Sequence, residues 1–477
     1  MSKNLALLIA VLVALAVVAV ACSSDADTSG ETGDDTAGQT DSDTTQPDDT
    51  SGETGDDDAG EPVDDAETGE GGDIDYQALG LWDDGPCDES SDPLVVGIMT
   101  VFESPVISLV DQAVALEAAA DAFNTRGGAN GACVEVHTCD DEANFETALA
   151  CVRDLEGAGV VATVNDQGSV AQTEVSAAMA EAGIPRVGGN VTNNDWADQN
   201  AYPIDASGTG STFLMPQALI QEGITEIGLV RVDLPAAGAM AGLFETLFEG
   251  DDATFPVDVA VPAGTTDYSQ FILAAENGGV GGIILAVGEQ EAIQVVRAGQ
   301  QLGTELQIGA SLGTFSYSSV ADFGDTADQM IFVTSFPPAT ADVPVYEVLR
   351  ADLAASGEEA LQPENLETSP MRSWISLYAL LRMIRDAGLT DFSGEAITTM
   401  LNEAEDVPML GLFGGEDWTP ARNREGLWQR AGTDSWGAWR WDPEAQWDGN
   451  PGNFVLTGEI SFSDVMCGSA FGAPGPC

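Results

Sequence analysis

The chain has 477 residues, and its 80 Asp and Glu against 14 Lys and Arg give a formal net charge of −66. This balance excludes nucleic acid as a partner, because no basic face is available to neutralise phosphates. The length is sufficient for two or three domains.

Residues 1–22 have the pattern of a secretory signal. Lys3 supplies the positive start, and an unbroken apolar run extends from Leu5 to Val20. The small residues before Cys22 are typical of a cleavage site, and together with Cys22 they resemble a bacterial lipobox. We therefore expect Cys22 to be lipidated and to anchor the chain to the outer face of the cell membrane. The alternative is an uncleaved membrane anchor, for which the apolar run is short.

Residues 23–92 are expected to form a disordered acidic tether. The part between residues 23 and 75 contains 20 Asp or Glu and no Lys or Arg. A segment of this composition buries too little apolar area to offset the entropy lost on ordering.

From Pro93 onward the pattern alternates between strands and helices. Expected strands are 94–99, 133–137, 160–164, 186–188, 227–232, 257–261, 283–287, 307–310 and 330–335. Expected helices are 108–124, 144–155, 169–182, 211–222, 238–248, 268–276, 290–302, 343–356 and 372–387. This alternation predicts an α/β protein with doubly wound sheets. Its size predicts two lobes rather than one.

The stretch GVVATVNDQGSVAQTEVSAAMAEAGIPRVGGNVTNND, residues 159–195, reads as one strand–helix–strand unit. Ser169 and Gln172 have the spacing of a capping box, which places the helix start at Ser169. Loops after parallel strands meet at one sheet edge, where helix N-termini and ligands also gather.

This stretch resembles the ligand-binding edge of type I periplasmic binding proteins, the leucine/isoleucine/valine-binding group. LVVGIMTVFESP, AFNTRGGANG, CDDEANFETALACVRDL and AGTTDYSQFI resemble further segments of the family, in the same order. The resemblance covers most of residues 93–410. It implies two Rossmann-like lobes joined by a multi-strand hinge, which close on a ligand by hinge motion.

The resemblance also implies where the chain crosses between the lobes, namely near Ser207, Phe336 and Asp406. The expected N-terminal lobe is 93–207 plus 336–406. The expected C-terminal lobe is 208–335 plus 407–466, and residues 467–477 are a tail. Six of the nine Trp fall between residues 418 and 447. We expect a small β-rich elaboration that packs its own core there, the alternative being a stacking surface for sugars or aromatic ligands.

Candidate ligand-binding residues follow the ends of the expected strands. They are Phe102, Gln167, Ser169, Asn190, Thr192, Asp233 and Glu289. The resemblance implies that Ser169 and Thr192 grip the α-carboxylate of a ligand. Ser169 is equally suited to capping its own helix, which needs no ligand.

The second lobe departs from the family pattern. In the amino-acid binders of the family, an acidic residue pairs with the ammonium group of the ligand. The corresponding position in this chain falls on or near Leu312, which has no charge. Asp233 or Glu289 could take over that role. Amides, urea-like compounds, short carboxylates and aromatic acids therefore stay open beside amino acids.

Seven Cys are present, and lipidation of Cys22 leaves six in an oxidising compartment. The resemblance suggests the pair Cys139–Cys151. Several pairings are open for the other four cysteines, and one of them joins Cys467 to Cys477 and Cys87 to Cys133. A single His, His137, and the absence of CxxC disfavour a metal site, so His137 is expected to be structural.

The sequence therefore predicts a monomeric solute-binding lipoprotein that passes a small polar ligand to the permease of an ABC importer. The alternative is a ligand-sensing receptor of the same fold without a transport role. No nucleotide-binding loop or nucleophile elbow is present, so we expect neither an enzyme nor a cofactor.

Overall fold

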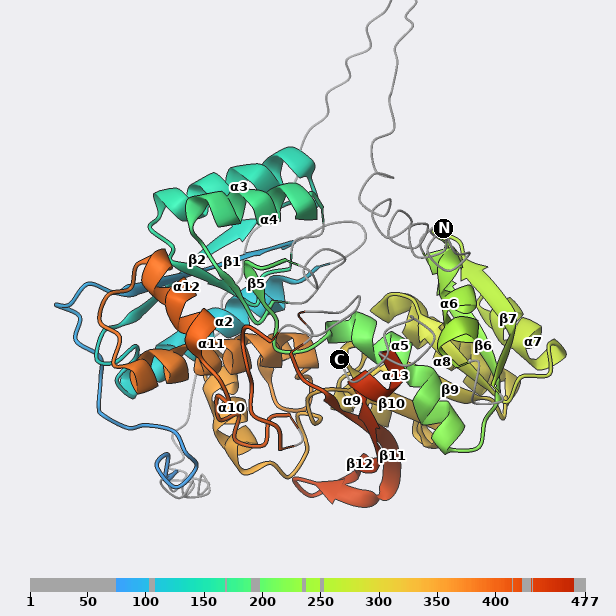
Figure 1. The fold of residues 1–477 in the computed structure, drawn as a ribbon. Helices are drawn as coiled ribbons and strands as arrows, with labels where there is room; N and C mark the ends of the chain where they lie inside the picture. The colour runs from blue at the N-terminus through green and yellow to red at the C-terminus, as the bar shows by residue number, and fades with distance from the viewer. Residues whose placement is uncertain are drawn as a thin grey trace, which may run out of the picture. The chain divides into compact units, whose positions relative to one another are not determined.

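The computed structural model describes residues 74–102, 108–167, 170–189, 198–233, 237–248, 253–413, 415–422, 430 and 432–466. Two sheets, each with helices on it, organise these residues (Figure 1). The predicted fold class, α/β with two doubly wound sheets, is confirmed.

The first sheet has five parallel strands in the order β2-β1-β3-β4-β5. Their bounds are β1 Leu94–Thr100, β2 Val134–Asp140, β3 Ala162–Val164, β4 Arg186–Val187 and β5 Ala201–Tyr202. Helices α3 (Phe145–Gly157) and α4 (Gln172–Ala182) lie side by side on one face, and α2 (Val110–Thr125) packs with α11 (Thr368–Ala387) (Figure 1). Gly97 sits within β1 because a Cβ there would lie 2.7 Å from Leu155 Cδ2.

The second sheet has seven strands in the order β12-β11-β10-β9-β8-β6-β7. Their bounds are β6 Glu226–Val232, β7 Thr254–Val261, β8 Gly282–Ala286, β9 Gln307–Ser311, β10 Met330–Thr334, β11 Ser435–Trp447 and β12 Asn450–Ser461. Neighbouring residues of β10 point to opposite faces, so Ile331 belongs to one apolar core and Phe332 to the other. Both faces are therefore covered, as a parallel sheet requires.

The remaining helices connect or cover these strands. Their bounds are α5 Ser207–Gln221, α6 Met240–Leu247, α7 Ser269–Asn277, α8 Glu289–Leu302, α9 Tyr317–Ala321, α10 Pro344–Ala354, α12 Gly394–Glu403 and α13 Phe462–Met466. Helix α12 and strand β5 were not predicted. The expected disordered tether of residues 23–92 is wrong for its last part, because Leu81 and Trp82 are buried and Cys87 is bonded to Cys133. The proposed lobe boundaries, 93–207 plus 336–406 and 208–335 plus 407–466, stay a prediction.

The last part of the Trp-rich segment forms β11, which pairs with β12 in an antiparallel hairpin that extends the second sheet beyond β10. Trp418 lies outside the hairpin and donates from Nε1 to the carbonyl of Pro203. The expectation of a β-rich elaboration is confirmed, but the expectation of a separate core is wrong. Trp436 joins the core on one sheet face and Trp441 the core on the other. Both rings are buried, at 1% and 7% exposed, so they serve packing rather than a stacking surface.

Helix α4 begins at Gln172 rather than at Ser169. Ala171 precedes it with φ of 54°, a left-handed conformation that interrupts helical geometry. The helix therefore cannot extend back to Ser169, which itself lies outside the described residues.

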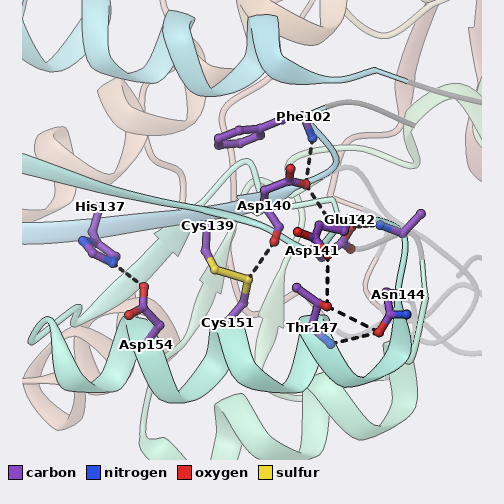
Figure 2. The surroundings of a disulfide bond; sticks show 11 residues. Phe102, His137, Cys139, Asp140, Asp141, Glu142, Asn144, Thr147, Cys151 and Asp154 are labelled. Carbon is purple, nitrogen blue, oxygen red and sulfur yellow. Dashed lines mark hydrogen bonds and ion pairs between the residues drawn. A yellow bond between two sulfur atoms is a disulfide. The ribbon is translucent and has the colours of Figure 1, made fainter. Parts of the chain in front are cut away.

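Two disulfides stabilise the first sheet and its surroundings. They join Cys87 to Cys133 and Cys139 to Cys151, the second linking β2 to α3 (Figure 2). Nearby, His137 Nε2 lies 2.7 Å from Asp154 Oδ2, which connects the same two elements. The expected structural role of His137 fits this pairing. Cys22, Cys467 and Cys477 lie outside the described residues.

A buried ion pair joins three distant parts of the chain. Arg372 of α11 donates two hydrogen bonds to the carboxylate of Asp205, which lies two residues before the start of α5. The hydroxyl of Ser335, directly after β10, donates to the same carboxylate. Because Asp205 is 1% and Arg372 is 4% exposed, the pair is shielded from water.

We expect Arg372→Met to lower the free energy of unfolding by about 3–5 kcal/mol, since it leaves the Asp205 carboxylate buried without a cation. Urea unfolding measures the change. Arg382→Met is the control on the same helix. Arg382 is 26% and its partner Asp386 is 55% exposed, so their pair is in contact with water and is worth at most about 1 kcal/mol. Equal losses in both variants would contradict the special role of the buried pair.

Candidate functional site

Two adjoining cavities lie where the carboxyl ends of strands face the start of α11. The larger has a volume of about 600 Å³ and the smaller of about 380 Å³. Both are lined by Val287, Gly313, Thr314 and Ser369. The larger cavity also receives residues from α2 and from the loop after β3, so elements of both sheets contribute to it.

Three carboxylates of the larger cavity sit at the N-termini of three helices. Asp111 is in the first turn of α2, Glu289 is the first residue of α8, and Glu367 is the residue before α11. Negative charge is favoured at such positions, because the helix N–H groups and dipole attract it. Each helix thus brings its own carboxylate to the cavity.

Burial opposes ionisation of these acids. It raises the pKa of Glu367 to about 8, and the charges of Glu289 and Asp111 add to the effect. The pKa of Glu289 is raised by burial and by Asp111. The pKa of Asp111 is raised by burial and by Glu358. Among the described residues that line this cavity there is no Arg, Lys or His to offset the charge.

A buried amide pair forms another part of the wall. Gln112, which is 1% exposed, donates from Nε2 to Oε1 of Gln167 at 3.0 Å. The Oε1 atom of Gln112 is buried and has no hydrogen-bond partner. Both residues line the larger cavity. Because the Oε1 atom of Gln112 has almost no accessible surface, the amide pair closes the wall and offers no acceptor to a ligand.

The smaller cavity is polar but nearly balanced in charge. Arg372 lines it together with Asp205, and the two neutralise each other. Hydroxyls from α5 and from the ends of β9 and β10 surround the pair, including Ser311, Thr334 and Ser335.

The structure brings two of the seven predicted binding residues to the larger cavity, namely Gln167 and Glu289. Phe102 and Asp233 line neither cavity. The Phe102 N–H donates to Asp140 Oδ1 at 3.1 Å (Figure 2), and the Asp233 N–H donates to the carbonyl of Val261.

Ser169, Asn190 and Thr192, the other three, lie outside the described residues, as does the strand-end acid Glu103. Asp166, a further strand-end acid, is fully buried and bonds to Arg186. Leu312 is 2% exposed and belongs to a core of the second sheet, so it offers no group to a ligand.

Sequence reasoning missed Asp111, Gln112 and Glu367. Asp111 and Gln112 interrupt the apolar run around VISLVDQAV, which is a weak signal for a residue facing a cavity rather than a core. Glu367 carries no signal, because one acid before a helix is unremarkable in a chain with 80 acids.

A profile of the family described as periplasmic binding protein matches residues 93–428. The chain belongs to this family. Its fold is that of the type I members, whose solved relatives are solute-binding proteins of ABC transporters. Among the described residues, no helix is both long enough and apolar enough to cross a bilayer.

Solved structures of low sequence identity share the fold. A solute-binding protein from R. palustris in complex with 4-hydroxybenzoate is 15% identical, with a TM-score of 0.61 over 78% of this chain and 97% of its own. A fatty acid ABC transporter substrate-binding protein from Thermomonospora curvata is 15% identical, with a TM-score of 0.62 over 81% and 96%. Another R. palustris protein, in complex with benzoate, is 11% identical, with a TM-score of 0.60 over 79% and 100%. No curated protein matches the chain.

The pKa of Glu367 predicts a pH dependence of stability without ligand. A carboxyl whose pKa is raised on folding stabilises the fold most below its ordinary pKa of 4.5, and this contribution is lost as pH rises to about 8. We expect Glu367→Gln to raise the melting temperature near pH 8 and to leave it unchanged near pH 5. Differential scanning calorimetry measures both values.

Glu181→Gln is the control, because Glu181 is an exposed acid on α4. This variant shows how much the melting temperature changes when any one negative charge is removed from the chain. The charges that face Glu367 are Glu289 from α8 and Asp111 from α2, and both remain in the variant. An equal rise in melting temperature at both pH values would contradict the assignment.

Proposed function

We propose that this protein is an extracytoplasmic solute-binding lipoprotein that captures a small polar ligand between its lobes and delivers it to an ABC importer. The observation that carries the proposal is the larger cavity, which lies within the family match and takes residues from the strand ends of both sheets. Its volume of about 600 Å³ suits a small molecule.

The ligand contacts in this proposal come from both sheets. Gln167 follows a strand of the first sheet, and Glu289 follows a strand of the second. The other proposed contacts follow strands of the first sheet and are Ser169, Asn190 and Thr192. Phe102 and Asp233 would contact a ligand only after a change in lobe arrangement, such as hinge closure. Two of the similar structures contain bound 4-hydroxybenzoate and benzoate, and a third protein is named for fatty acids. The fold therefore accommodates ligands other than amino acids.

Delivery requires that the protein stays near its permease. The lipidated Cys22 would hold it at the membrane, and residues 23–73 would give the binding domain reach. A flexible coil of about 50 residues spans roughly 40 Å, and its negative charges extend it further. The protein acts as a monomer in this proposal, with the permease subunits as its protein partners.

A thermal-shift screen of amino acids, amides, amines, short carboxylates and aromatic acids tests the binding function. A ligand at about 100 times its Kd adds roughly 2.7 kcal/mol of stability, which gives a clear shift. We expect Thr314→Trp, which places a large ring at a position that lines both cavities, to reduce the shift strongly. Thr399→Trp on the exposed side of α12 should retain it. A shift that survives Thr314→Trp would place binding elsewhere.

The lipid anchor is tested separately. We expect Cys22→Ser to move the protein from the membrane fraction to the soluble extracytoplasmic fraction, because the thioether linkage needs the thiol. Fractionation with immunoblotting, together with labelling by a radioactive fatty acid, measures the change. Ser23→Ala is the control and should stay lipidated. A Cys22→Ser protein that remains membrane-bound would support the uncleaved anchor instead.

A further inference from the structure

We propose that the solute of the larger cavity is an extended organic cation, an aliphatic diamine or polyamine, held between Asp111, Glu289 and Glu367. This inference rests on the proposed binding function and adds the chemical class of the ligand. Two features of the cavity support it: its net charge, and the arrangement of its acids on three separate helices beside apolar side chains.

The net charge of the cavity wall favours a cation. Its lining includes four carboxylates, from Asp111, Glu289, Glu291 and Glu367, and no basic side chain among the described residues. The N-termini of α2, α8 and α11 would otherwise suit a ligand carboxylate. Because each already carries its own acid, an anionic ligand would meet repulsion there.

The arrangement of the acids disfavours a metal ion as the ligand. Among the described residues, no three His, Cys, Asp or Glu are close enough together to hold a metal ion. The carboxylates instead come from three separate helices, and Leu109, Val287 and Pro370 add apolar surface to the cavity. An aliphatic chain with an amine at each end matches this arrangement, because its methylenes meet the apolar side chains.

Binding of such a cation should release protons. The nearby positive charge favours the ionised form of Glu367, whose pKa in the empty cavity is about 8. The ligand amines stay protonated across the same pH range. Affinity should therefore rise between about pH 6 and 8, as Glu367 becomes easier to ionise.

The experiment is isothermal titration calorimetry of the full chain with putrescine and spermidine, in about 0.2 M NaCl to screen surface attraction. We expect one saturable site per chain. Glu367→Gln and Glu289→Gln should each weaken putrescine about 10- to 100-fold, as loss of a charge-assisted contact does. Repeating the titration in buffers of different ionisation enthalpy should show proton release that is smaller in Glu367→Gln.

The controls address the many acids elsewhere in the chain. Glu181→Gln should bind putrescine like the unchanged protein, and every variant retains the acidic residues 23–92. n-Butylamine, which has one charge on a chain of the same length, should bind at least about tenfold more weakly. Succinate, the dianion of similar length, should not bind.

Several outcomes would overturn the inference. Amine binding that is unsaturable, or equal in all variants, would show attraction by the surface rather than by the cavity. One-to-one binding of an amino acid, amide or aromatic acid without amine binding would refute the cationic class and leave the proposed function standing. No binding by any compound, in this titration or in the wider screen, would remove support for both.

Discussion

The buried pair of Asp205 and Arg372 determines where the cavity walls can lie. Asp205 precedes α5, its carboxylate also accepts from Ser335 at the end of β10, and Arg372 lies in the second turn of α11. The first turn of α11 lines both cavities, and Glu367 directly precedes it. Because removing one charge of a buried pair is costly, these three segments keep their mutual position. Glu367 is thereby held in a fixed place relative to the start of α5 and the end of β10.

The same pair illustrates how the few basic residues are distributed. Arg126 binds Asp352 and Arg186 binds Asp166, both as buried pairs in or beside the first sheet. Exposed arginines pair with surface acids such as Asp386. With 14 basic residues against 80 acidic ones, most acids have no cation available. At the surface water compensates for this shortage. In the half-buried cavity the raised pKa values show that the acids are neutralised by protons unless a cation binds.

The fold could be predicted from sequence because alternating apolar strands and amphipathic helices leave a clear periodic pattern. The candidate site was only partly predictable, since Gln167 and Glu289 follow strand ends, where ligands gather in such sheets. Asp111 and Glu367 come from helix starts far apart in the chain, and tertiary packing alone brings them together. The start of α4 was wrong because the left-handed conformation of Ala171 has no signal in the residue type. The Trp hairpin was expected to pack on itself, since pairing with β10 is a long-range contact.

The charge of an acid at a helix N-terminus is stabilised by the helix dipole and destabilised by burial. The balance of these two effects determines the charge of the cavity. The helix dipole stabilises the charge by about 0.3–1 kcal/mol at an exposed site. At Glu367 burial and the neighbouring charges outweigh this gain, because the pKa rises to about 8 rather than falling. Helix stability alone therefore does not account for an acid in this place. A cation that enters the cavity reverses the balance, since it removes the repulsion among carboxylates that come from both sheets and from α11. Ligand binding and the approach of the cavity walls are thus favoured by the same electrostatic change.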